Sequence, residues 1–217
     1  MLHKSNFFDN IGVLFKKYPT VDLTDLFSKG QMDSKRWLVD MLVELDLPLG
    51  VVFICAGWYG SLATFLFESD LKINKIRSFD IDPLCADIAD TFNRSWVMNQ
   101  WEFKAITADI MDIDYQHHTW QIWSNANNRM CRPITDSPDT VINTSCEHIE
   151  NFAEWYDKIP KGTLVVLQSN NFQEVNEHVN CSIDAESFSI SAPMENCLFL
   201  GELELEKYTR FMKIGTK

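Results

Sequence analysis

Short apolar segments and longer segments with apolar residues at helical spacing follow one another along this chain. The short segments are bounded by polar or turn-forming residues, as is typical of buried strands. They predict strands over residues 51–55, 76–81, 103–107, 140–143 and 163–168. The longer segments predict helices over residues 33–45, 61–68, 84–97 and 150–159, with Asp33 or Ser34 capping the first. Strands that alternate with helices form a parallel sheet covered on both faces, so the sequence predicts an α/β fold.

The last part of the chain departs from this alternation. Residues 196–204 and 208–214 both have extended patterns, and a short charged stretch connects them. Two adjacent strands with a tight connection form an antiparallel hairpin. The sheet is therefore expected to end in a hairpin rather than in another strand–helix unit.

One internal segment, residues 116–138, fits neither pattern. It contains two tryptophans, many polar residues and two prolines near its end. A long irregular insertion in a compact domain is often a lid or a binding loop. The alternative is a surface excursion with Trp120 and Trp123 packed on the core. We expect one domain over residues 33–217 that carries this irregular insertion, and a cap segment over residues 1–32.

An uncharged run over residues 47–67 has the length of a membrane span, which needs about 20 apolar residues. A proline and three glycines interrupt the run, and its first part is β-branched, which favours a strand. Asp46 and Glu68 bracket it, and Lys and Arg do not cluster on one flank as the orientation rule expects. The run therefore predicts a strand, a glycine turn and the start of a helix.

The net charge and the cysteine content limit the partners that this protein is expected to bind. The net charge is −12, and an acidic protein repels phosphate backbones, which argues against a general nucleic-acid binder. The six cysteines lie far apart without a C-x-x-C pair, so no metal site is expected, and Cys55 is expected to be a buried hydrophobe. The N-terminus lacks an apolar secretory segment, so we expect a cytoplasmic protein with reduced thiols and no membrane contact.

The glycine turn AGWYG, residues 56–60, holds the first candidate binding groups. Gly57 and Gly60 let the backbone approach a ligand, and the helix that follows offers free N–H groups, although a tight turn without a ligand is the alternative. Asp80 ends the second strand about 20 residues further on, where a carboxylate binds a ribose hydroxyl in nucleotide-binding folds. Asp82 competes for this role, and a helix-capping aspartate is the alternative reading.

The later strands end in further polar groups at the same edge of the sheet. After the third strand, Asp109 could accept a hydrogen bond from an adenine amine while Ile110 packs on the ring. After the fourth, Glu147 and His148 are adjacent titratable residues, and His148 could act as a general base or cap the next helix. The fifth strand ends in the binding groups Gln168, Asn170 and Asn171. His178 follows, with Glu174 and Glu177, on a segment expected to be solvated.

Four motifs in this order resemble those of the class I S-adenosylmethionine-dependent methyltransferases. FICAGWYGSLA is similar to the glycine loop of that family, SFDIDP to its acidic second motif, TADI to its adenine-contacting third and VINTSCEHI to its fourth. The terminal hairpin is similar to the family's sixth and seventh strands, whereas dinucleotide dehydrogenases usually continue with a parallel strand. The match spans residues 51–214, and the bulky Trp58 and Tyr59 depart from the smaller residues that the family often has.

The resemblance implies a specific sheet and a cofactor. The sheet is Rossmann-like, mostly parallel and seven-stranded, with order 3-2-1-4-5-7-6 and helices on both faces. The cofactor is S-adenosyl-L-methionine. The implied cofactor contacts are Ala56, Gly57, Tyr59, Gly60, Asp80, Ile81, Asp109, Ile110 and Asn143.

The expected activity is methyl transfer, with a small-molecule acceptor ahead of a protein or an RNA. If the acceptor is a hydroxyl or an amine, His148 or Glu147 is the expected catalytic base. The acceptor pocket is expected between residues 116–138, 144–148 and 168–172, with residues 1–32 closing over it. Three alternatives stay open: an enzyme that uses the cofactor for non-methyl chemistry, a non-catalytic scaffold of the same fold, and an NAD-linked oxidoreductase. The missing third glycine and the hairpin disfavour the last of these.

Overall fold

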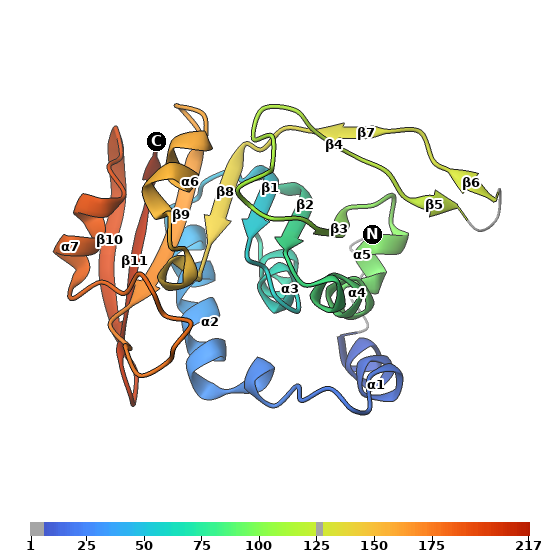
Figure 1. Ribbon diagram of the computed structural model, residues 1–217, viewed down its shortest axis with the longest axis horizontal. Coiled ribbons are helices and arrows are strands. Elements are labelled where there is room, and N and C mark those ends of the chain that lie inside the picture. Colours follow the sequence, from blue (N-terminus) through green and yellow to red (C-terminus); the bar gives the residue numbers. More distant parts are fainter. Residues whose placement is uncertain (1–6, 125–127) are drawn as a thin grey trace.

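A seven-stranded sheet forms the centre of the molecule (Figure 1). The computed structural model describes residues 7–124 and 128–217. The strands of the sheet are β1 (Gly50–Cys55), β2 (Ile73–Asp80), β3 (Phe103–Thr107), β8 (Thr140–Asn143), β9 (Leu164–Asn170), β10 (Asn196–Glu204) and β11 (Thr209–Thr216). They lie in the order β10-β11-β9-β8-β1-β2-β3. When these seven strands are numbered 1 to 7 along the chain and the sheet is read from β3 to β10, the order is 3-2-1-4-5-7-6. The expected order is therefore confirmed.

Five strands of the sheet are parallel, so their carboxyl ends lie at one edge of the sheet. β1 pairs in parallel with β2 and β8, while β3 and β9 extend the parallel part on either side. Only β11, among the strands of this sheet, runs antiparallel to its two neighbours, and with β10 it forms the expected terminal hairpin. The register places Cys55 beside both Phe79 and Asn143. The turns that follow β1, β2 and β8 therefore leave the sheet side by side.

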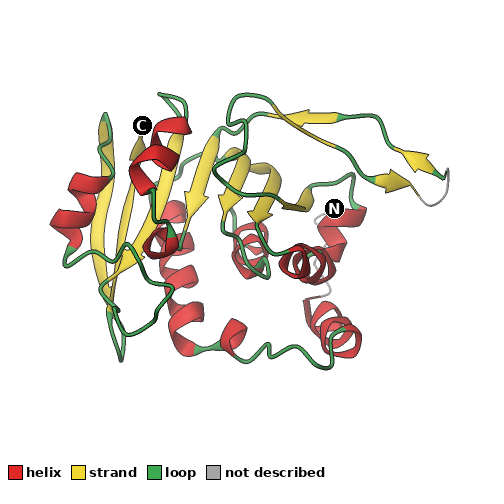
Figure 2. Cartoon of the chain, in the orientation of Figure 1, coloured by secondary structure: helices red, strands yellow, loops and turns green. Residues whose placement is uncertain are grey.

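Helices cover both faces of the sheet, as Figure 2 shows. They are α1 (Phe7–Lys17), α2 (Lys29–Glu44), α3 (Ser61–Glu68), α4 (Pro83–Phe92), α5 (Arg94–Met98), α6 (Phe152–Lys158) and α7 (Ala185–Ser191), with short 3-10 turns η1 (Asp25–Phe27) and η2 (Cys146–His148). Val52 and Ile54 of β1 pack with α2 and α3 on one face. Phe53 and Cys55 point to the other face, toward α6 and α7. This alternation follows from the two-residue period of a strand.

The uncharged run over residues 47–67 is divided between β1, the glycine turn and α3, as predicted. The strand is buried on both faces of the sheet, which explains why its sequence is almost continuously apolar. Among the described residues, no helix is both long and apolar enough to cross a membrane.

Residues 116–138 are not irregular, which corrects the expectation for this insertion. They contain four short strands, β4 (His118–Trp120), β5 (Trp123–Ser124), β6 (Arg129–Met130) and β7 (Ile134–Asp136). β4 pairs with β7 and β5 with β6, both antiparallel, so the segment forms an arm of two consecutive ribbons. Residues 125–127 lie outside the described part. Strands of two or three residues are too short to show a hydrophobic period, which is why the sequence pattern did not reveal them.

The arm lies at the amino-terminal edge of the parallel strands. Asp136 forms a buried ion pair with Arg77 of β2 (Nε–Oδ2 2.7 Å), and Asp139 accepts a hydrogen bond from the Val51 N–H at the start of β1 (2.8 Å). Figure 1 shows the arm opposite the arrowheads of β1, β2 and β8. Trp120 is buried at its base, whereas Trp123 is exposed. The arm therefore does not line a pocket at the carboxyl edge, contrary to the expectation.

The N-terminal segment also differs from its expected boundary. α2 begins at Lys29 rather than at Asp33, because the Ser28 hydroxyl caps it by accepting from the Gln31 N–H. Ser34 is buried inside the helix and donates to Gln168 of β9 (2.9 Å). The expected boundary at residue 32 thus falls within α2. Residues 1–6 of the expected cap lie outside the described residues, and α1 packs on α4.

Candidate functional site

The turns after β1, β2 and β3 are joined by backbone hydrogen bonds at the carboxyl edge. Gly57 N–H donates to the carbonyl of Phe79 (2.9 Å), and Ala108 N–H donates to the carbonyl of Asp80 (2.9 Å). β8 ends beside β1, so Asn143 reaches the same edge. The structure therefore brings the predicted binding residues of these four turns together.

The glycine turn is tightly packed and holds two residues in unusual backbone conformations. A Cβ on Gly57 would lie 2.0 Å from the Ser78 hydroxyl oxygen, so no side chain fits there unless the Ser78 side chain moves. Ala56 (φ 52°) and Trp58 (φ 47°) lie in the left-handed region, which side chains other than glycine rarely adopt. Such residues store strain of about 1–3 kcal/mol each and are typical of binding sites.

Asp80 is held at the centre of this edge by two backbone donors. Its Oδ2 accepts from the Trp58 N–H (2.8 Å), and its Oδ1 accepts from the Asp82 N–H (3.1 Å). A carboxylate oxygen has two lone pairs, so each oxygen can accept one further bond from a ligand hydroxyl. The competing residue, Asp82, caps α4 by accepting from the Leu84 N–H (2.8 Å). The geometry favours Asp80 for ligand binding.

The remaining predicted cofactor residues differ in accessibility. Ile81 is 70% exposed at the edge. Asp109 accepts from the Met111 N–H (2.8 Å), whereas Ile110 is buried in the core and offers little surface for stacking on a ring. Asn143 is fully buried, and its Oδ1 accepts from the Ser145 N–H (2.8 Å). Its Nδ2 has no partner among the described residues, so a donor is left for a ligand.

Trp58 and Tyr59 support the N-terminal segment. Their rings stack with centroids 4.5 Å apart and pack against the cluster that α1 and η1 form with α4. The cluster consists of Leu14, Tyr18, Leu23, Leu26, Ile88 and Phe92. The two bulky residues thus pack against residues 11–27, which explains their departure from the small residues of the family pattern.

A cavity of about 560 Å³ lies next to the carboxyl end of β8. Residues 144–148 and residues 170–172 contribute to its wall, as the sequence predicts for the acceptor pocket. The start of α2 and the turn between β10 and β11 also line it. Residues 28–31 belong to the N-terminal segment that was expected to close over the pocket, whereas the hairpin turn was not expected. Both segments come from distant parts of the chain, so only the folded topology brings them to the pocket.

The wall of the cavity contains a buried ion pair. Glu147 is 2% exposed, and its Oε1 accepts from Arg210 Nη1 of β11 (3.1 Å) and from Asn170 Nδ2 (2.6 Å). The same Arg210 nitrogen donates to the carbonyl of Thr144 (2.8 Å). Glu147 is therefore fixed by its partners and is poorly suited to carry protons as a base. Its second oxygen, Oε2, has no partner among the described residues.

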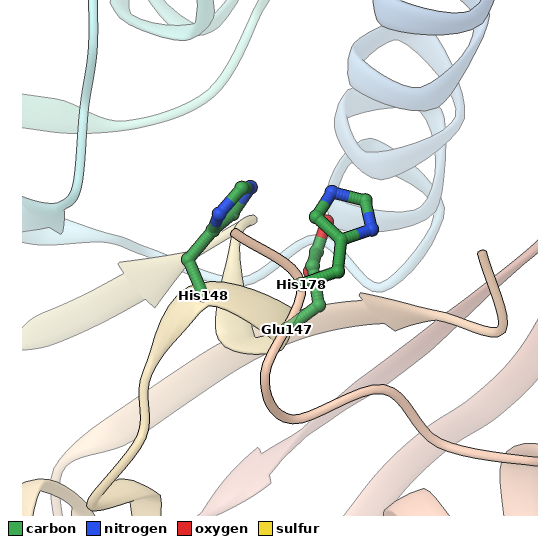
Figure 3. Close-up of side chains that lie close together, drawn as sticks. All are labelled: Glu147, His148 and His178. Atoms are coloured by element: carbon green, nitrogen blue, oxygen red, sulfur yellow. The ribbon is translucent and has the colours of Figure 1, made fainter. Parts of the chain in front are cut away.

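His178 lies on a largely exposed segment, as expected, but its ring also packs against His148. The two rings are 4.6 Å apart between centroids and nearly perpendicular, at 87°. Figure 3 shows both rings beside Glu147, with His148 coming from the turn after β8 and His178 from the loop after β9. No local sequence pattern links these histidines, because their proximity depends on the course of that loop.

Lys35 of α2 is a further unexpected group in the cavity wall. It is buried, and its ammonium donates to the Gln31 side chain. Burial, together with the nearby charge of Arg210, lowers the pKa of Lys35 to about 7. This amine is therefore partly neutral at physiological pH.

Comparison with known proteins supports the fold assignment. Neither a protein-family model nor a curated protein matches this sequence. Among solved structures, N-methyltransferase NodS from Bradyrhizobium japonicum WM9, in complex with S-adenosyl-L-homocysteine, is similar with a TM-score of 0.63 at 10% identity, covering 96% of this chain and 98% of that one. Magnesium protoporphyrin IX methyltransferase from Synechocystis PCC 6803, with bound S-adenosylmethionine, gives 0.55 at 13% identity over 98% and 92%. The fold is that of the class I S-adenosylmethionine-dependent methyltransferases.

A third similar structure is a putative sarcosine dimethylglycine methyltransferase from Galdieria sulphuraria, with a TM-score of 0.59 at 10% identity. The alignment covers 96% of this chain and 98% of that one. At identities this low, the similarity shows that the chains have the same fold and does not identify the methyl acceptor.

Proposed function

We propose that this protein is an S-adenosylmethionine-dependent methyltransferase that acts on a small molecule. The main support is Asp80, which is fixed beside the glycine turn and keeps a lone pair on each carboxylate oxygen. A ribose presents two adjacent hydroxyl donors to such a carboxylate. The buried and unpartnered Nδ2 of Asn143 supplies a donor at the same edge. These groups fit the cofactor that the methyltransferase fold accommodates.

The proposed cofactor site follows the carboxyl edge of the sheet. Its residues are Ala56, Gly57, Tyr59, Gly60, Asp80, Ile81, Asp109, Ile110 and Asn143, of which Ile110 contributes mainly by supporting the loop from the core. The cofactor supplies a methyl group already activated by its sulfonium. The protein has to align the acceptor with this methyl group, and proximity and orientation supply much of the rate.

The cavity beside Asn143 is the proposed acceptor site. Its volume of about 560 Å³ is in the range of small-molecule sites. The cavity wall combines aromatic groups such as Phe172 and Tyr208 with charged ones. When its ring binds no other ligand, His148 is the proposed proton acceptor for a hydroxyl or amine. It is exposed and lines the cavity, whereas Glu147 is held in its ion pair with Arg210.

Replacing Asp80 by alanine tests the cofactor site. The variant should bind S-adenosylmethionine about 10- to 100-fold more weakly, because ribose hydroxyls lose a charged acceptor worth about 1.5–3 kcal/mol. Binding is measured by calorimetry and by the thermal shift that a ligand of the native state produces.

Asp82→Ala is the matched control. It should lose about 1 kcal/mol of stability with the helix cap but keep its affinity for the cofactor. Loss of affinity in Asp82→Ala alone would transfer the role to Asp82.

If neither S-adenosylmethionine nor S-adenosylhomocysteine shifts the melting temperature of the unmodified protein, the cofactor assignment is wrong. Formation of methylthioadenosine instead of S-adenosylhomocysteine would indicate non-methyl chemistry.

A further inference from the structure

We propose that Glu147, His148 and His178 form a binding site for one divalent transition-metal ion in the wall of the acceptor cavity. One potential ligand atom from each residue lies within 4.8 Å of the others. Three donors bound to one zinc ion at about 2.0–2.2 Å lie roughly 3–3.5 Å apart. Small side-chain rotations therefore bring the three groups to bonding distance. No local sequence pattern predicts this site, because His178 lies far from Glu147 and His148 along the chain.

Hydrogen bonds orient both histidines for metal binding. Nδ1 of His148 lies 3.1 Å from the carbonyl oxygen of Glu177, and Nδ1 of His178 lies 2.5 Å from that of Phe172. A carbonyl oxygen only accepts, so each Nδ1 must carry the proton and each Nε2 keeps a free lone pair. Metal-bound histidines typically donate their other ring N–H in this way.

The buried carboxylate of Glu147 is an independent indication of a bound metal ion. Glu147 is 2% exposed, and one oxygen is satisfied by Arg210 and Asn170. The other, Oε2, is buried and has no hydrogen-bond partner among the described residues. A buried charged oxygen without a partner is costly. An ion bound by this oxygen together with the two imidazoles would remove this cost.

The set of ligands indicates the class of ion. Two imidazoles and one carboxylate suit zinc, manganese and iron, whereas calcium and magnesium prefer oxygen ligands throughout. Three protein ligands leave coordination positions open, and His148 and His178 both line the cavity. An ion here would lower the pKa of a bound acceptor hydroxyl, and His148 would then be a ligand rather than the base. This role depends on the proposed methyltransferase function, but the binding itself does not.

The test is titration of the chelator-treated, dialysed protein with Zn²⁺, and separately with Mn²⁺, by calorimetry. We expect one ion per chain, and an affinity lowered at least about 100-fold in both His148→Ala and His178→Ala. The matched control is His117→Ala, which removes an exposed histidine from the arm and should leave the affinity unchanged. Titration with Co²⁺ should give visible absorption bands that disappear in the two site variants.

Absence of binding by all three ions, or equal affinity in the unmodified protein and both site variants, would overturn the proposal. The thermal shift with S-adenosylmethionine is measured in the presence of chelator. A protein that binds the cofactor but no ion therefore refutes only the metal site. A protein that binds the ion but not the cofactor refutes only the proposed function.

Discussion

Replacing Asp136 by asparagine is expected to lower the free energy of unfolding by about 3–5 kcal/mol, because it leaves a buried guanidinium without a counter-charge. Arg77 is 1% exposed, and its Nε donates to Asp136 Oδ2 (2.7 Å). The indole N–H of Trp120 donates to the same oxygen (2.8 Å), so the carboxylate joins the arm to β2. The change is measured by urea denaturation at pH 7.

The pH dependence of the lost free energy of unfolding is a second test of this ion pair. Burial alone would raise the pKa of Asp136, but the hydrogen bonds from Arg77 and Trp120 and the charge of Arg77 hold it below the ordinary value of 3.8. The stabilisation is therefore complete above this value and is lost as the pH falls through the lower pKa of the folded state. The difference between the unmodified protein and Asp136→Asn should shrink accordingly in acid.

Lys75→Met is the matched control for the ion pair. Lys75 lies 3.5 Å from the other oxygen of Asp136, but its side chain is 42% exposed. An exposed ion pair contributes at most about 1 kcal/mol, so the control should be nearly as stable as the unmodified protein. Equal stability of Asp136→Asn and Lys75→Met would contradict the prediction.

Replacing Lys35 by methionine is expected to raise the free energy of unfolding at pH 7 by about 1–4 kcal/mol. A buried cation has lost its hydration, and an apolar side chain of similar volume avoids this cost. Because burial and Arg210 lower the pKa of Lys35 to about 7 from 10.5, unfolding takes up a proton between these two values. The stability of the unmodified protein therefore rises with pH over this interval, and the advantage of the variant declines.

The experiment compares urea midpoints of both proteins from pH 6.5 to pH 10. Lys29→Met is the control, because Lys29 is in the same helix but its side chain is 83% exposed, and a change within about 0.5 kcal/mol is expected. A Lys35→Met variant that is less stable than the unmodified protein at pH 7 would show that the ammonium is favourably solvated. Loss of acceptor methylation in a stable variant would assign Lys35 to acceptor binding.

The sheet could be predicted from the sequence because its strands are long enough to show their pattern. β3, β8 and β10 begin and end at the predicted residues. The insertion could not be predicted, since strands of two or three residues carry no period and its position depends on Arg77 and Asp136. The start of α2 was missed because Ser28 and the glycine after Lys29 are typical of a loop as well as of a helix start.

The candidate site could be predicted only where a strand end supplies the residue. Asp80 and Asn143 are the last residues of strands whose place follows from the parallel sheet. His178, Lys35 and Arg210 come from a loop, a helix and the hairpin that surround the cavity. Their proximity depends on packing between distant segments, which no local pattern records.

The stacked pair of Trp58 and Tyr59 makes the N-terminal segment part of the proposed cofactor site. Trp58 holds a left-handed backbone conformation while its N–H donates to Asp80, and its ring lies in the cluster formed with α1 and η1. Contacts with residues 7–27 therefore compensate for the strain that a glycine at position 58 would avoid. Removal of this segment would release the turn and weaken the hold on Asp80, the proposed ribose-binding carboxylate. If the proposed cofactor site is correct, its affinity is coupled to the folding of residues that precede the first strand.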